Sequence, residues 1–258
     1  MFKIIGVLSN PDKDPGLEFA QRLIRLLNAK GCETAVGDNV FDRADAVIAL
    51  GGDGTMLKAS RQAAVRGIPV LGINLGTLGY LTDVERDEAE QALNSLLAGR
   101  FRVESRMMLS TDSIDTPALN DVCVMRCGAK LLSASLYING EPVDTVRADG
   151  IVVATPTGST AYSLSAGGPI LKPDCEMIVV TAICPHMLTM RPLVVSASDV
   201  VSVRMHNDAE INMDGENVTL VPKGGVIAIR RSSYTARVIK TKELGFYEIL
   251  RRKLMMCK

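Results

Sequence analysis

The amino-acid sequence predicts two domains of different class, an N-terminal parallel α/β domain over residues 1–100 and a C-terminal, mostly antiparallel β domain over residues 101–240. In the first hundred residues, short apolar runs alternate with segments of helical periodicity, as expected of parallel strands covered by helices. After Arg100, strand-like runs dominate, and Asn139-Gly140 and Asp214-Gly215 are strong hairpin-turn signals.

In the first domain, we expect buried strands at residues 2–8, 46–50 and 68–73, and helices at 17–27, 56–66 and 86–98. Gly31 and Gly99 follow the first and last of these helices, where they are suited to end them. The first helix has an apolar face made by Leu17, Ala20, Leu23, Leu26 and Leu27.

In the second domain, strands are expected at residues 131–138, 151–154, 177–181, 200–205 and 226–230. Helical spacing returns at residues 244–254, within a C-terminal segment, 241–258, that is expected to pack back on the first domain.

Composition limits the classes of function. The chain has 258 residues, 47% of them hydrophobic and 22% charged, as in soluble globular proteins. Lysine plus arginine equals aspartate plus glutamate at 29 each, so no general attraction to nucleic acid or an anionic membrane is expected. We find no apolar stretch of the roughly 18 residues that a membrane helix needs and no signal peptide, and the six cysteines contain no Cys-x-x-Cys. A cytoplasmic protein with reduced thiols is expected.

A glycine-rich loop, Gly51-Gly52-Asp53-Gly54-Thr55, follows the strand 46–50 and precedes a helix. Glycines let a ligand approach the backbone closely, and the amides at a helix N-terminus attract anions, so the loop is suited to phosphate. Asp53 is unusual there, because a carboxylate repels phosphates unless it orients or deprotonates an attacking hydroxyl or interacts with Mg²⁺ on the phosphates. The alternative is that Asp53 only caps the helix.

A second glycine-rich loop, residues 72–82, follows the next strand. Ligands of open parallel sheets bind outside the carboxyl ends of the strands, so the two loops are expected to share one crevice. The alternative is an ordinary glycine-rich connection.

Polar segments also flank strands of the second domain. Asp149-Gly150 precedes the strand 151–154, and the hydroxyl-rich residues 155–163 follow it. This run suits hydrogen bonding to ribose and amide groups, but a plain serine–threonine turn, or a nucleophile at Ser159 or Thr160, remains possible. Asn120-Asp121 is a further polar pair beside the strand-like residues 122–125.

Taken together and in family order, these segments resemble the NAD kinase family. The resemblance is carried by residues 51–55, 72–82, 120–121, 149–150 and 155–168. Diacylglycerol and sphingosine kinases share the first motif, whereas the run 155–169 is highly specific.

The resemblance implies a Rossmann-like N-terminal domain, a C-terminal β domain and phosphorylation of the adenosine ribose of NAD. Asp53 would be the base that faces the 2′-hydroxyl, and Asn120 with Asp121 would bind the adenosine part. The remaining implied substrate-binding residues are Gly54, Lys58, Arg147, Asp149, Thr160, Ala161, Tyr162, Ser163 and Ser165. The resemblance also implies ATP or another triphosphate or polyphosphate as donor, a divalent metal, Mg²⁺, that accompanies it, and a homodimer or homotetramer.

Two positions depart from the usual family pattern. Asp121 stands where the family commonly has glutamate, and Glu216, after Asp214-Gly215, stands where it often has glutamine. Both substitutions keep a hydrogen-bonding group and therefore affect contacts more than the reaction.

Three other functions remain as alternatives. A lipid kinase would share the first loop but would need an apolar acceptor channel or a membrane-binding surface. An NAD-dependent oxidoreductase would need the third glycine of its motif, where this chain has Leu57. A non-catalytic NAD sensor would not need Asp53.

Overall fold

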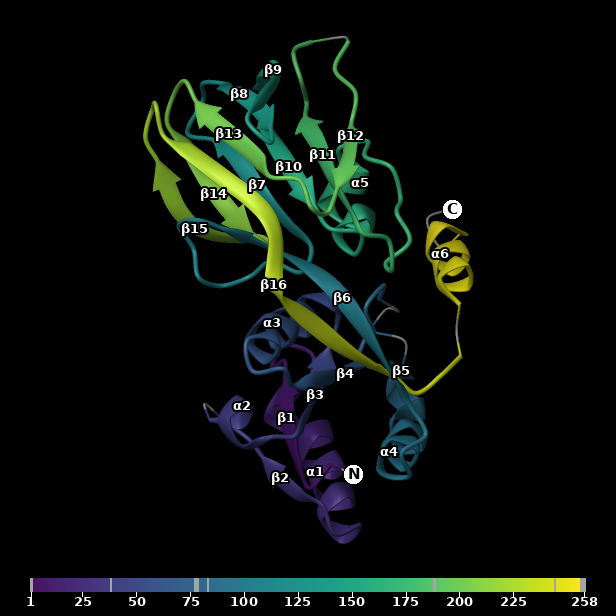
Figure 1. Ribbon diagram of the computed structural model, residues 1–258. Coiled ribbons are helices and arrows are strands. Elements are labelled where there is room, and N and C mark those ends of the chain that lie inside the picture. Colours follow the sequence, from purple (N-terminus) through teal and green to yellow (C-terminus); the bar gives the residue numbers. More distant parts are fainter. Residues whose placement is uncertain are drawn as a thin grey trace. The chain divides into compact units, whose positions relative to one another are not determined.

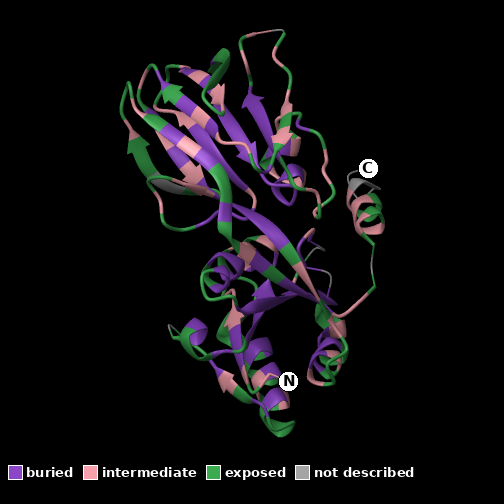
Figure 2. Cartoon of the chain, in the orientation of Figure 1, coloured by how far each residue is buried: buried purple, intermediate pink, exposed green. Residues whose placement is uncertain are grey.

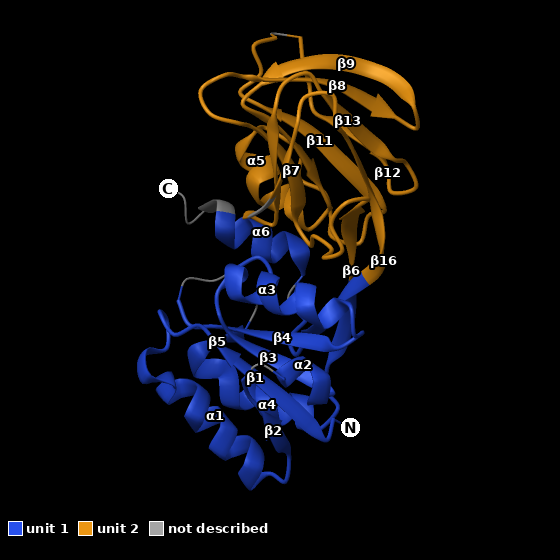
Figure 3. Ribbon diagram, turned by 90° about the vertical axis from the view of Figure 1, so that its left-hand side faces the viewer, with its two compact units in different colours: residues 1–105, 235–258 blue, residues 106–234 orange. Residues whose placement is uncertain are grey.

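The computed structural model describes residues 2–37, 39–76, 79–82, 84–187, 189–243 and 245–255 (Figure 1). The chain forms two compact units, residues 1–105 with 235–258 and residues 106–234 (Figure 3). The boundaries between the units fall inside two strands, β6 (Arg102–Thr111) and β16 (Val226–Lys240).

The first unit contains a parallel sheet in the order β2-β1-β3-β4. The last residues of β16 and the short β5 also pair with β4 in parallel. The strands are β1 (Ile4–Ser9), β2 (Glu33–Ala35), β3 (Ala46–Gly51), β4 (Pro69–Asn74) and β5 (Val84–Glu85). Every residue of β3 and β4 is buried, as expected of parallel strands covered on both faces (Figure 2).

Helices cover the two faces of this sheet. Leu23 and Leu27 of α1 and Leu93 of α4 belong to one core with Ile48 and Leu71 of the sheet. Strand residues alternate between faces, so Gly72 of β4 points the other way, where it lies against Met56 of α3. The helices of this part of the chain are α1 (Glu18–Ala29), α2 (Val40–Arg43), α3 (Asp53–Ala64) and α4 (Ala89–Leu97), with 3-10 turns η1 (Pro15–Leu17) and η2 (Arg86–Glu88). A further helix, α6 (Phe246–Met255), follows β16 near the C-terminus.

The second unit contains antiparallel strands. One sheet has the order β12-β11-β10-β7-β14-β15, and β16, β13, β8 and β9 pair side by side in the other. The inward side chains of both form one apolar core that includes Val124, Ile151, Leu136 and Val203. The strands are β7 (Asp121–Arg126), β8 (Leu132–Ile138), β9 (Glu141–Ala148), β10 (Gly150–Ala154), β11 (Met177–Ile183), β12 (Leu193–Ser196), β13 (Val201–Met205), β14 (Ala209–Met213) and β15 (Glu216–Val221).

The outer face of the first of these sheets carries a short helical segment, η3 (Gly158–Thr160) and α5 (Tyr162–Ser165). Cys123, Val152 and Val179 of the sheet form a smaller core there, against which Ala166 and Leu171 pack. The segment that resembles a substrate-binding run is therefore seated on a rigid sheet.

The predicted fold class is confirmed, and both hairpin turns lie where the sequence indicates them. Asn139-Gly140 joins β8 to β9, and Asp214-Gly215 joins β14 to β15, with positive φ at all four residues. Several strands were not predicted, β6 and β9 among them. Many of their residues are exposed or half-buried, so their sequences lack the regular apolar spacing that indicates a strand. In the part of the chain that the structure describes, no helix is long and apolar enough to span a membrane.

Candidate active site

In the first unit, the loop between β3 and α3 is shaped by its glycines. A Cβ on Gly51 would overlap the side chain of Thr55, so this position admits only glycine without rearrangement. The N-cap of α3 is Gly52, and the first residues of the helix are Asp53 and Gly54. Gly54 is exposed with nothing within 4 Å of its Cβ position, which leaves the first turn of amides accessible to an anion.

Asp53 binds the second glycine-rich loop. Its carboxylate accepts hydrogen bonds from the backbone amides of Tyr80 (2.8 Å) and Leu81 (3.0 Å). A Cβ on Gly79 would overlap this carboxylate, which explains the glycine at that position. No side-chain cap is formed at the start of α3, so the interpretation of Asp53 as only a helix cap does not describe its contacts. Residues 77, 78 and 83 of the second loop lie outside the described residues.

A pocket of about 630 Å³ opens beside this loop. One wall is formed by residues 8–13, the end of β1 and the turn after it, and the other is Gly52–Thr55 with Lys58, Ala59 and Gln62 of α3. Its position at the carboxyl ends of β1 and β3 is where open parallel sheets bind their ligands. Gly54 and the exposed Lys58 are thereby placed in one pocket with Asp53.

Lys13 also lines this pocket, and the sequence analysis missed it. The signal that could have identified it is its place in the turn that directly follows the first parallel strand, at the same edge of the sheet as the glycine loop.

In the second unit, Asn120 and Asp121 lie where the chain enters β7, and Asp214 fixes the backbone at this point. The Asp214 carboxylate accepts hydrogen bonds from the backbone amides of Leu119, Asn120 and Asp121 at 2.7–3.1 Å. Asp214 is thus a positioning residue, a role that neither its hairpin-turn signal nor its place in the family pattern indicates.

The Asp121 side chain is 4% exposed and accepts a hydrogen bond from the Cys123 thiol at 3.3 Å. Burial, with a smaller contribution from the negative charge of Asp214, raises the pKa of Asp121 to about 6. Burial and the neighbouring Asp121 also raise the pKa of the Cys123 thiol, so this sulfur stays protonated as a donor.

The loop after β10 is hydrogen-bonded to the backbone just before β7. Thr155 donates its hydroxyl to the carbonyl of Leu119 (2.6 Å), and its amide donates to the carbonyl of Asn120 (2.8 Å). A Cβ on Gly158 would overlap the Asn120 backbone, so the close approach requires glycine. Asn120 and the residues from 155 onward are therefore brought together.

Most hydroxyls of this loop have internal partners. Ser159 donates to the carbonyl of Pro156 (2.6 Å), Thr160 donates to that of Thr157 (3.1 Å), and Ser163 lies 3.3 Å from the Thr181 hydroxyl. No base contacts Ser159 or Thr160 among the described residues, and Ser159 is fully buried. A nucleophile at either residue has no support.

Tyr162 and Ser165 are exposed on α5, and Ala161 lies between them and η3. Burial raises the pKa of the Tyr162 phenol, so it remains an uncharged hydrogen-bonding group.

Arg147 lies on β9, and Asp149 lies between β9 and β10. Asp149 forms an ion pair with Arg126 (2.8 Å from Nε to Oδ1), a partner that the sequence analysis missed. Arg147 is exposed, and its carbonyl accepts a hydrogen bond from the amide of His186.

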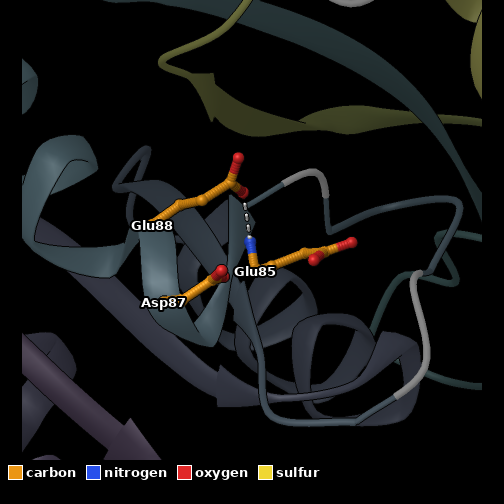
Figure 4. A group of neighbouring side chains, drawn as sticks. All are labelled: Glu85, Asp87 and Glu88. Carbon is orange, nitrogen blue, oxygen red and sulfur yellow. Dashed lines mark hydrogen bonds between the residues drawn. The ribbon is translucent and has the colours of Figure 1, made fainter.

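One cluster of carboxylates occurs among the described residues, Glu85, Asp87 and Glu88 (Figure 4). Glu85 and Glu88 form a reciprocal capping box at η2, and Glu88 is ion-paired with Lys242. The capping box and the ion pair explain why carboxylates gather here: they stabilise the start of a helix.

Comparison with known proteins identifies both halves of the chain. Residues 33–101 match the family model described as the ATP-NAD kinase N-terminal domain, and residues 119–241 match that of the ATP-NAD kinase C-terminal domain. The chain is similar to an NAD kinase of Ruminiclostridium cellulolyticum, with 38% identity over 98% of each chain.

Solved structures give the same result. An NAD kinase from Archaeoglobus fulgidus in complex with ATP has 28% identity and a TM-score of 0.86, covering 98% of each chain. A yeast NADH kinase complexed with NADH has a TM-score of 0.84 over 98% of this chain and 87% of the other, and at 24% identity it supports the fold alone.

Proposed function

The chain belongs to the ATP-NAD kinase family, and from this premise we propose that it transfers the terminal phosphoryl group of ATP to the 2′-hydroxyl of the adenosine ribose of NAD, giving NADP. The observation that carries the proposal is Asp53, a carboxylate that is held by two backbone amides and lines a pocket of about 630 Å³.

The fixed carboxylate explains how an unreactive hydroxyl could be activated. A ribose hydroxyl is a weak nucleophile near neutral pH, and a positioned base accepts its proton as the bond to phosphorus forms. Tyr80 and Leu81 orient the Asp53 carboxylate through their amides, which fixes the direction in which it can receive the proton. The leaving group is the nucleoside diphosphate, which is ADP when ATP is the donor.

The donor phosphates are proposed to lie in the pocket against the first turn of α3, where Gly54 exposes the backbone and Lys58 adds a positive charge. Mg²⁺ accompanies the donor and neutralises charge on the transferring phosphates. Since amides bind phosphate and ignore the base, we expect other nucleoside triphosphates, and polyphosphate, to serve as donors.

The dinucleotide is proposed to bind the polar groups of the second unit. Asn120 and Asp121 would bind the adenosine, because Asp214 fixes the backbone of both residues and Thr155 fixes that of Asn120, whose side chain stays partly exposed. The other proposed contacts are Arg147, Asp149, Thr160, Ala161, Tyr162, Ser163 and Ser165. The hydroxyls of Thr160 and Ser163 are engaged in hydrogen bonds within the protein, so we expect these residues to contact the dinucleotide through their backbone groups.

Purified protein is expected to convert NAD to NADP with ATP and Mg²⁺. NADP is measured by an NADP-specific dehydrogenase, with diacylglycerol, sphingosine and a no-acceptor reaction beside NAD. NADP formation that exceeds lipid phosphorylation supports the proposal. Phosphorylation of a lipid without NADP would assign the chain to a lipid kinase, and NAD binding without turnover would indicate a sensor.

We also propose that the enzyme is cytoplasmic and assembles as a homodimer or homotetramer. Sedimentation velocity at several protein concentrations tests the assembly, and a monomer at micromolar concentration would contradict it.

A further inference from the structure

We propose that Lys13 binds the phosphates of the donor, supplying from the first loop of the fold the positive charge that the glycine-rich loop itself lacks. The inference rests on the proposed function and adds a residue to its donor site. Its basis is the position of the Lys13 ammonium in the pocket beside Asp53.

A triphosphate needs a cation that the glycine loop does not provide. A phosphate-binding loop of the P-loop type carries a lysine that reaches the β- and γ-phosphates. Here the corresponding loop, residues 51–55, contains no basic residue and carries the carboxylate of Asp53. A carboxylate at this place repels the phosphates of a donor, so it opposes donor binding unless cations balance its charge.

Lys13 lies where such a cation is required. Its Nζ is so close to the glycine loop that a Cβ on Gly52 would lie 2.7 Å from it, and a Cβ on Gly76 would lie 3.6 Å from it. Gly52 is the N-cap of α3, and Gly76 is the second residue after β4. The ammonium therefore faces the starts of both glycine-rich loops, and the glycines leave room for it.

The loop that carries Lys13 is fixed at both ends. The carbonyl of Asn10 accepts the amides of Lys13 (3.0 Å) and Asp14 (2.9 Å), and the Asn10 amide donates to Leu50 at the end of β3. Asp14 is 3% exposed and bonds to Ser9 and to the amides of Phe19 and Ala20, which start α1. A lysine on so ordered a turn loses little further backbone freedom on binding a ligand.

The structure gives Lys13 no ion-pair partner among the described residues, although two aspartates flank it in the sequence. Asp14 is committed to the start of α1, as described above. An unpaired ammonium held against a glycine loop in a pocket of this size is well placed to bind a polyanion.

The experiment compares Lys13→Met with the wild type and with Lys30→Met. Lys30 is a matched control, since it is an exposed lysine of the same unit at the far end of α1. Inorganic tripolyphosphate, ATP and adenosine are titrated calorimetrically, and Michaelis constants for ATP and NAD are measured. Lys13→Met is expected to raise the dissociation constant of tripolyphosphate and the Michaelis constant of ATP at least about tenfold, the lower range for a lost charged hydrogen bond.

Adenosine binding and the Michaelis constant for NAD should change less than twofold, Lys13→Arg should restore most of the ATP affinity, and Lys30→Met should behave as wild type. Unchanged tripolyphosphate binding in a folded Lys13→Met variant would overturn the inference, as would an equal loss for NAD. Tripolyphosphate binding is measured without turnover, so it tests the role of Lys13 even in a protein that makes no NADP. The absence of NADP would refute the proposed function alone.

Discussion

At the scale of single residues, the Asp53 carboxylate has two separable properties, hydrogen-bond acceptance and basicity. The amides of Tyr80 and Leu81 use the first, and the proposed proton transfer uses the second. Asp53→Asn keeps the size and one acceptor oxygen, so it loses only one of the two hydrogen bonds, and the protein should stay folded and still bind NAD. Because the amide cannot take the proton, turnover should fall at least ~10²-fold.

The measurements are turnover, melting temperature and NAD affinity on one preparation, with Asp12→Asn as a control that removes an acidic side chain from the same pocket. Donor affinity should be unchanged or tighter in Asp53→Asn, because a negative charge near the phosphates is gone. Near-normal turnover would leave Asp53 only as the link between the two glycine loops.

Asp121 gives the molecule a stability that depends on pH. Its pKa is about 6 in the fold and 3.8 in the unfolded reference, so the folded state binds a proton more tightly. This group therefore stabilises the fold increasingly as pH falls through 6, and its contribution disappears as pH rises above 6. Relative to Asp121→Asn, the wild type should gain about 1 kcal/mol of unfolding free energy between pH 7 and pH 5.

Urea unfolding of both proteins at pH 7, 6 and 5 measures the difference. A difference that stays constant over this range would mean that Asp121 is ionised throughout and that its burial is compensated by other contacts.

At the scale of elements, the sequence predicted the loops that follow β3, β4 and β10, since each comes directly after a buried strand and is rich in glycine or in hydroxyl residues. The reason for individual glycines could not be predicted. Gly79 is required by the Asp53 carboxylate and Gly158 by the Asn120 backbone, and both neighbours are distant in sequence. Such requirements follow from tertiary contacts, which no local pattern encodes.

The same limit applies to Asp214 and β16. Asp214-Gly215 correctly predicted a hairpin, but the three amides that the Asp214 carboxylate accepts lie more than ninety residues earlier. β16 was expected to end at residue 230 and continues to Lys240, because its later residues pair with β4 in the first unit. Pairing partners extended a strand whose exposed residues give a weak signal on their own.

At the scale of the whole molecule, the cation of the reaction is expected to belong to the substrate and not to the fold. A structural metal site needs several converging ligands that have no other partner. The carboxylate cluster among the described residues, Glu85, Asp87 and Glu88, is instead engaged in a capping box and an ion pair with Lys242. Mg²⁺ usually binds through one or two carboxylates together with substrate phosphates, which suits the pocket beside Asp53.

We therefore predict that EDTA abolishes NADP formation and leaves the melting temperature within about 2 °C of its value with Mg²⁺, a range that corresponds to less than ~1 kcal/mol for a protein of this size. Added ATP should raise the melting temperature only when Mg²⁺ is also present, because the free energy by which a ligand stabilises the fold rises with the logarithm of its affinity. Differential scanning fluorimetry with and without EDTA, ATP and excess Mg²⁺ separates these contributions, and the NADP assay is run on the same samples. A melting temperature that drops by 5 °C or more on chelation alone, and recovers with Mg²⁺, would place a metal ion within the fold and contradict the prediction.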